Sequence, residues 1–175
     1  ISQLLNDLLT LGYAEPGLIF AVGITKMFTS VDVWLINYGT FITGSILGLI
    51  LAYIIKSYAI SNIVLNSALN SIPIALDESA QTLGASKLKL LKDIHVPLLK
   101  TGLITTFLLV MAELIKELPA TLILRPFNFD TLSVSVYLLA SEERMFEAAF
   151  PSLVIIIFGL IPIYFLNKLI LSNDK

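Results

Sequence analysis

Two long apolar stretches constrain the fold of this 175-residue chain more than any other feature. Residues 33–55 and 148–167 contain no Asp, Glu, Lys or Arg, and a helix needs about 20 mostly apolar residues to cross a bilayer. Hydrophobic residues make up 57% of the chain and charged residues 14%, which is far from the balance of a soluble protein. The sequence therefore predicts an all-α, polytopic transmembrane helix bundle.

Two further stretches are long enough to span a membrane although they carry charges. Residues 13–29 contain Glu15 and Lys26, and residues 98–118 contain Lys100 and three ionisable side chains near their end. Together with the uncharged stretches they give four expected spans, at about 13–29, 33–55, 98–118 and 148–168.

Lysine and arginine concentrate on the cytoplasmic side of membrane proteins, so their positions predict the orientation of the spans. In a four-span arrangement Lys56, Lys168, Lys175 and the lysines between 87 and 100 fall on one side. The basic residues that fall on the other side are Lys26, Lys116, Arg125 and Arg144. The loop at about 71–97 and both chain ends are therefore expected in the cytoplasm.

Several function classes lack the residues that they need. The net charge of -2 gives no reason to expect nucleic-acid binding, and the absence of cysteine excludes disulfides, thiolate metal sites and cysteine nucleophiles in this chain. The H-E-x-x-H pair and the G-x-S-x-G elbow are both absent. His95 is the single histidine and is expected at a surface or docking position, because a closed metal site needs several ligands. We therefore expect no catalytic residue, no metal site and no cofactor in this chain.

Small residues recur at intervals of four in the second expected span. Gly44, Gly48 and Ala52 would share one helix face and let a neighbouring backbone come close. We expect these three residues to form a helix-packing face.

Residues 71–97 are too charged to span and are predicted to form two short amphipathic helices with a turn between them. Pro73 stands near a helix start, where its missing N–H costs nothing, and Gly84 can adopt the positive φ that ends a helix. Ser86 can cap the second helix, which Pro97 is expected to break where the third span begins. The apolar faces are predicted to consist of Leu76, Ala80 and Leu83 in the first helix and Leu88, Leu91 and Ile94 in the second.

These apolar faces need a surface that covers them, and the residues alone allow two. The helices can lie on lipid headgroups, aided by Lys87, Lys89 and Lys92. They can equally dock on a protein partner.

The spacing of residues 78–97 resembles the EAA motif of binding-protein-dependent ABC permeases, the MetI-like transmembrane domains. The matching residues are Glu78, Ser79, Ala80, Gly84, Ile94, Val96 and Pro97. Ser79 stands for the usual second alanine and Val96 for the usual leucine, and neither change alters the spacing. In that family the motif forms coupling helices that sit in a cleft of the ATPase.

The resemblance implies a division of labour among several partners. A cytoplasmic ABC ATPase dimer would bind and hydrolyse ATP, so this chain would be a transport subunit and not an enzyme. A periplasmic substrate-binding protein would deliver the cargo, and a second permease half, fused or separate, would complete the path across the bacterial inner membrane. The residues that it assigns to ATPase coupling are Leu76, Glu78, Ser79, Ala80, Leu83, Gly84, Ile94 and Pro97.

The family resemblance extends from about residue 12 to residue 168, and residues 116–149 look like the ferric-iron permease branch. Such permeases are usually fused double repeats, so this chain, which begins at Ile1, is expected to be the C-terminal part of a longer permease. Thiamine, polyamine, sulfate and phosphonate permeases share the broader architecture and remain alternatives. From another class, a structural or channel-like membrane protein whose loop lies on lipid also remains an alternative.

Ionisable side chains at membrane depth mark a second candidate site. Glu113 and Glu117 could line a path for a hard cation such as ferric iron, or they could lie at the interface with their carboxylates in water. Glu113 is also spaced to pair with Lys116 on one helix face.

The segment after these carboxylates is expected to leave the helix. Pro126 should end a helix and restrict Arg125, and Arg125 and Asp130 are expected to brace the loop around it. Residues 118–130 are therefore the candidate outer gate.

Overall fold

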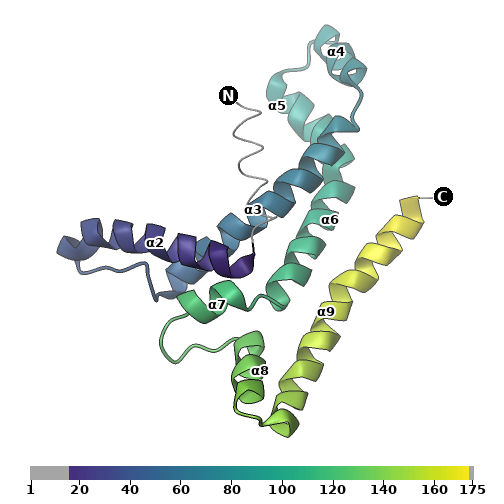
Figure 1. Cartoon of the computed structure of the whole chain (residues 1–175). Helices are drawn as coiled ribbons and strands as arrows, with labels where there is room; N and C mark the ends of the chain where they lie inside the picture. The colour runs from purple at the N-terminus through teal and green to yellow at the C-terminus, as the bar shows by residue number, and fades with distance from the viewer. Residues whose placement is uncertain (1–15, 174–175) are drawn as a thin grey trace.

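The computed structural model describes residues 16–173, and every regular element within them is a helix (Figure 1). Within residues 16–173, four helical stretches are long and apolar enough to cross a membrane: Gly17–Tyr38, Ile46–Asn70, Lys87–Ile115 and Met145–Leu171. Their long helices are α2 (Gly17–Leu35), α3 (Ile46–Asn70), α6 (Val96–Ile115) and α9 (Met145–Asn173). The prediction of an all-α polytopic bundle is confirmed for these residues, whereas the first residues of the span expected at 13–29 lie outside them.

Shorter elements connect the long helices. Those between α3 and α6 are α4 (Ile74–Thr82), α5 (Lys87–Leu90) and the π-helical turn η2 (Leu91–His95). Those between α6 and α9 are α7 (Pro119–Leu124) and α8 (Leu132–Ser141), and the 3-10 turn η1 (Ile36–Tyr38) extends α2.

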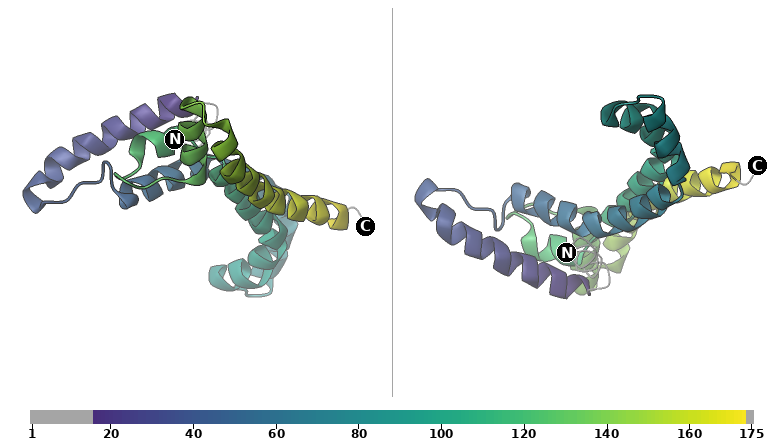
Figure 2. Two further views of the ribbon diagram at one scale, coloured as in Figure 1. Left: turned by 90° about the horizontal axis from the view of Figure 1, so that it is seen from below. Right: turned by 90° about the horizontal axis from the view of Figure 1, so that it is seen from above.

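Helices α3 and α6 run side by side along the middle of the molecule (Figure 1). The α4–α5 segment projects from one end of this pair, and α7 and α8 lie near the other end. Helix α9 begins beside α8 and runs along α6 before it diverges from it (Figure 2). The α4–α5 segment and the α7–α8 segment therefore lie at opposite ends of the α3–α6 pair.

The main buried cluster lies where α2, α3 and α7 meet. Its members are Ala21, Ile24, Phe28, Leu49, Ala52, Ala120 and Leu124. α7 approaches α2 closely, since a Cβ added to Gly17 would lie 3.0 Å from Cγ of Pro119. α7 is thus held in a corner that α2 and α3 form.

The second expected span, residues 33–55, differs from the structure, because its first part does not belong to the helix that crosses. α2 ends at Leu35, and Gly39 and Gly44 adopt positive φ values of 67° and 71°, which favour glycine and interrupt a helix. Asp32 holds this connection by accepting the backbone N–H groups of Ile42 (2.6 Å) and Thr43 (3.0 Å). The spanning helix α3 starts only at Ile46.

The prediction of a packing face is wrong for Gly44, which lies before α3. Ser45 caps the helix, and its Oγ accepts the N–H of Gly48 at 3.0 Å. Gly48 is needed for contact with its own loop, since a Cβ there would lie 2.1 Å from the carbonyl oxygen of Ile42. Ala52 is fully buried in the cluster with α2 and α7.

Pro97 does not break a helix, contrary to expectation. It lies in the first turn of α6, and the π-helical turn η2 joins α5 to α6 without interruption. Proline cannot donate a backbone hydrogen bond and its ring crowds the preceding turn. The wider π turn just before it accommodates both effects, so the chain continues as one helix.

Candidate functional site

The segment between α3 and α6 folds back on itself, and we call residues 74–95 the hairpin. Gly84 ends α4 with a φ of 79°, its N–H donates to the carbonyl of Gln81 at 2.9 Å, and the N–H of Ala85 donates to that of Ala80 at 3.0 Å. Ser86 Oγ accepts the N–H of Lys89 at 3.3 Å and caps α5. The predicted roles of Gly84 as the end of one helix and Ser86 as the cap of the next are confirmed.

The apolar side chains of the hairpin divide into exposed and buried ones. Leu83 is 88% exposed, Leu88 77% and Ile74 75%, whereas Ala80 is 8% exposed. Leu76 is exposed as well, so the predicted common face of Leu76, Ala80 and Leu83 is wrong for Ala80. Ala80 packs inward because the turn at Gly84 folds the chain back over it.

The polar motif residues of the hairpin point outward. Glu78 and Ser79 are exposed, and Ser79 Oγ donates to the carbonyl of Ala75 at 2.7 Å within its own helix. Ile94 is half-buried and Pro97 exposed. The side chain of Glu78 is thus available to a second protein.

His95 braces the hairpin, a role that the sequence did not reveal. Its Nε2 lies 2.9 Å from Oδ1 of Asp77, and the two side chains are 17% and 31% exposed. The contact ties η2 to α4 across the turn. His95 is therefore an internal contact of the hairpin, whereas a surface or docking position was expected; its side chain is largely covered within the chain.

Close packing connects the hairpin to the rest of the molecule through α3 and α6. A Cβ added to Gly102 of α6 would lie 2.7 Å from Cβ of Ala68 in α3, so the two backbones approach where only glycine fits. On α3 the side-chain amide of Asn66 donates to that of Asn62 at 2.9 Å. The two helices form a tightly packed pair below the hairpin.

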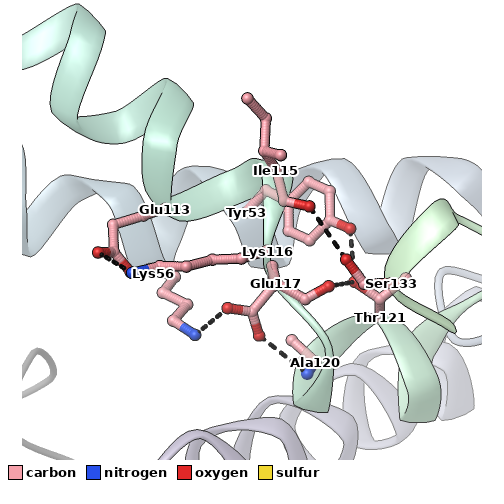
Figure 3. Close-up of polar contacts among 9 residues, drawn as sticks. All are labelled: Tyr53, Lys56, Glu113, Ile115, Lys116, Glu117, Ala120, Thr121 and Ser133. Atoms are coloured by element: carbon pink, nitrogen blue, oxygen red, sulfur yellow. Dashed lines mark hydrogen bonds and ion pairs between the residues drawn. The ribbon is translucent and has the colours of Figure 1, made fainter. Parts of the chain in front are cut away.

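A group of polar side chains lies where this pair meets α7 and α8, and we call it the polar corner (Figure 3). Its members are Tyr53, Lys56, Glu117, Thr121 and Ser133. Lys56 Nζ and Glu117 form an ion pair in which the glutamate side chain is 5% exposed. The second carboxylate oxygen of Glu117 accepts the N–H of Ala120 at 3.1 Å.

Hydrogen bonds complete the polar corner. The hydroxyl groups of Tyr53 and Thr121 lie 2.6 Å apart, and Thr121 Oγ1 donates to the carbonyl of Glu117 at 3.2 Å. Ser133 Oγ of α8 donates to the carbonyl of Ile115 at 3.0 Å (Figure 3). Four helices are thereby joined at one point, because these bonds involve α3, the end of α6, α7 and α8.

Two expectations about charge placement are corrected by the polar corner. Lys56 lies within α3, inside the second candidate span, and not after the end of that span as expected. Glu117 is buried against Lys56 and does not extend its carboxylate into water. The neighbouring Glu113 does pair with Lys116, as predicted, at 2.9 Å on the exposed surface of α6 (Figure 3).

The loop after α7 is closed by the residues that were expected to brace it. α7 ends at Leu124, and Arg125 is extended before Pro126, as the sequence predicts. Arg125 forms an ion pair with Asp130 across the loop. The loop borders an open cavity of about 480 Å³, lined by Leu122, Arg125, Pro126, Phe127, Asn128 and Asp130.

A second charged group stands between α8 and α9. Arg144 pairs with Glu147 and, at 3.1 Å, with Glu142. Their hydrogen bonds raise the pKa of the Arg144 guanidinium, which therefore stays charged. Among residues 16–173 no three His, Cys, Asp or Glu side chains gather in a way that could hold a metal ion.

Comparison with known proteins gives one family and two curated relatives. The family model for the binding-protein-dependent transport system inner membrane component matches residues 1–172. The Fe(3+)-transport system permease protein FbpB 2 of Haemophilus influenzae is 26% identical over 156 residues, which are 89% of this chain and 29% of that protein. The ferric transport system permease protein FbpB of Actinobacillus pleuropneumoniae is 28% identical over 116 residues, 65% of this chain and 17% of that protein.

The chain thus spans less than a third of the length of these relatives. No solved structure matches it.

Proposed function

The chain belongs to the family of binding-protein-dependent transport system inner membrane components, and from that membership we propose that it acts in an ATP-driven importer as a permease subunit. It is a multi-pass membrane protein of the ABC permease family. We place it in the bacterial inner membrane, as the C-terminal part of a longer permease whose other half is fused or separate.

The hairpin is the single observation that carries this proposal. Leu83 and Leu88 are exposed at one end of the α3–α6 pair, on a segment whose turn is fixed by Gly84. Exposed apolar side chains on a small, stiff, charged segment fit the cleft of a protein partner. We propose that a cytoplasmic ATPase dimer binds this surface and that Glu78 offers its carboxylate to a basic residue there.

We propose that movement of the ATPase is passed to the membrane helices as a rigid-body displacement. The ATPase closes on ATP and displaces α4, and the packed α3–α6 pair carries the displacement to the other end of the molecule. At that end we propose that residues 118–130, which comprise α7 and the loop braced by Arg125 and Asp130, form the outer gate. A periplasmic binding protein delivers the cargo to this side.

Ferric iron is the proposed cargo. Two relatives, 26% and 28% identical over the matched residues, are named as ferric-iron transport permeases, and residues 116–149 resemble those of ferric-iron permeases. The carboxylate of Glu117 is engaged by Lys56 and Ala120, so it is not free to ligate a cation in this conformation. Glu113 also pairs with a lysine, Lys116, but this pair is largely exposed, so Glu113 is the better candidate for lining the path.

The experiment is to purify the complete protein with its neighbouring ATPase, reconstitute both in lipid, and measure ATP hydrolysis with and without the binding protein. We expect the binding protein to stimulate hydrolysis. A complex that hydrolyses ATP at the same rate in both conditions contradicts the importer proposal and leaves the structural or channel-like alternative.

Uptake of radiolabelled ferric iron in a deletion strain tests the cargo separately. We expect uptake to be lost and to return with the complete gene. An intact iron phenotype with a thiamine or polyamine defect would contradict the cargo while leaving the permease assignment standing.

A further inference from the structure

The ion pair between Lys56 and Glu117 lies where α3 meets the residues between α6 and α7. Lys56 stands ten residues after the first residue of α3 (Ile46–Asn70), and Glu117 is buried. Removing two charges from water is unfavourable, and apolar residues of similar volume often stabilise such a site as well or better. Packing alone therefore does not explain why the pair is there.

Glu117 joins two elements through one carboxylate. One oxygen pairs with Lys56 of α3, and the other accepts the N–H of Ala120 in the first turn of α7 at 3.1 Å (Figure 3). The 2.6 Å contact between the hydroxyls of Tyr53 and Thr121 links the same two helices a second time. Displacing Lys56 would disturb the N-terminus of α7 directly, because the same carboxylate holds both.

Helix α3 connects this carboxylate to the hairpin without a break. Lys56 and Asn70 lie in one helix, and their separation of 14 residues corresponds to about 21 Å at 1.5 Å per residue. α4 begins at Ile74, shortly after α3 ends. A displacement of the hairpin therefore reaches Lys56 through a stiff element.

We propose that Lys56 and Glu117 form a latch that holds α7 against α2 and α3, and that movement of α3 during the ATPase cycle releases it. Both are positioning residues, which act through α7 and not on the cargo. This inference rests on the proposed function and extends it to the gating step. In this proposal the outer gate is closed while the latch holds α7. The latch therefore also opposes the ATPase conformation that is coupled to an open gate.

The test uses the double variant Lys56→Met/Glu117→Gln in the complete, reconstituted complex. This variant leaves no unpaired buried charge, and the glutamine carbonyl can still accept the N–H of Ala120. We expect ATP hydrolysis without the binding protein to rise at least about fivefold, the lower end of usual coupling between sites. If the pair only stabilised the structure, ATP hydrolysis by the double variant would depend on the binding protein as it does in the wild type. That result would overturn the latch.

Lys116→Met is the matched control. It also removes the lysine partner of a glutamate, but from the exposed Glu113–Lys116 pair on the surface of α6, so hydrolysis should keep its dependence on the binding protein. If the wild-type complex itself is not stimulated, the proposed function fails. If the wild type is stimulated and the double variant behaves like it, only the latch fails.

A cross-link tests the latch independently of these side chains. The chain contains no cysteine, and a Cβ at position 17 would lie 3.2 Å from Cβ of Pro119, so a small outward shift would bring the two atoms into the range of about 3.5–4.5 Å found in disulfides. In Gly17→Cys/Pro119→Cys, oxidation should stop transport by fixing α7 to α2, and dithiothreitol should restore it. Each single cysteine variant should be insensitive to oxidation.

Continued transport by a fully cross-linked protein would overturn the latch, because α7 would then not need to move.

Discussion

The hairpin and the polar corner lie at opposite ends of the α3–α6 pair and are completed in opposite ways. The hairpin leaves Leu83 and Leu88 exposed, although hydrogen bonds and the contact between His95 and Asp77 fix its own fold. The polar corner pairs its charges and hydroxyl groups within the chain, as Lys56 and Glu117 show. The difference supports our proposal that another protein completes the hairpin, whereas the polar corner holds α7 through contacts within the chain.

The largest expected effect breaks the hairpin. Proline at Gly84 cannot adopt the φ of 79° and removes the N–H that donates to Gln81. Gly84→Pro should therefore reduce transport to background, measured as uptake in vesicles, with insertion unchanged because Gly84 lies between the candidate spans Ile46–Asn70 and Lys87–Ile115. Gly84→Asn should fall between this variant and the wild type, because asparagine tolerates positive φ.

Normal uptake by Gly84→Pro would contradict the docking role of the hairpin. Loss of the protein from the membrane would show instead that the turn is needed for folding.

The next largest effect is expected from a substitution that disrupts the polar corner. Lys56→Met leaves the buried Glu117 carboxylate without its partner, and breaking a buried pair in this way costs about 3–5 kcal/mol. We expect a large fall in the free energy of unfolding. Thermal melting of the protein in detergent measures it. Lys116→Met should cost less than about 1 kcal/mol, since its pair with Glu113 is largely exposed. Equal losses in the two variants would mean that the corner is not a buried site.

A smaller effect tests the connection between the two regions. A side chain at Gly102 must displace Ala68, whose Cβ would lie 2.7 Å from a new Cβ, and overpacking of this kind costs about 1–3 kcal/mol. Gly102→Leu should lower the melting temperature and weaken coupling. Gly159→Leu is the control, because no atom lies within 4 Å of a Cβ there, and it should melt close to the wild type.

The smallest expected effect comes from removing the contact between His95 and Asp77 in the hairpin. His95→Ala removes the contact with Asp77, worth about 1 kcal/mol, so affinity for the ATPase should fall roughly fivefold in a pull-down titration. Asp77→Asn keeps a hydrogen-bonding group opposite the ring and should lose less. An affinity that does not change in either variant would show that this brace does not position α4.

The sequence predicted local features of the hairpin better than long-range ones. The turn at Gly84 and the cap at Ser86 depend on residues within a few positions, and both are as expected. The inward packing of Ala80 was missed, because helical periodicity does not show how the following segment folds back. The family was predicted from the spacing of residues 78–97 and is confirmed.

The contacts of the polar corner could not be predicted from the sequence, for a physical reason. Lys56 and Glu117 are 61 residues apart, and no local pattern links two charges on different spans. The break in residues 33–55 did leave a signal: Asp32 precedes Gly39 and Gly44, and two glycines with an acidic residue nearby are typical of a turn. Hydropathy did not reveal the break, because residues 36–45 are as free of charged side chains as residues 46–55 at the start of α3.

Chemical cross-linking from the two ends of the molecule tests the central claim most directly. In the complete complex, cysteine at Leu83 on the hairpin should cross-link to the ATPase, and cysteine at Phe127 on the loop after α7 should not, although that side chain is 94% exposed. Cross-linking of the ATPase from position 127, or none from position 83, would contradict the account.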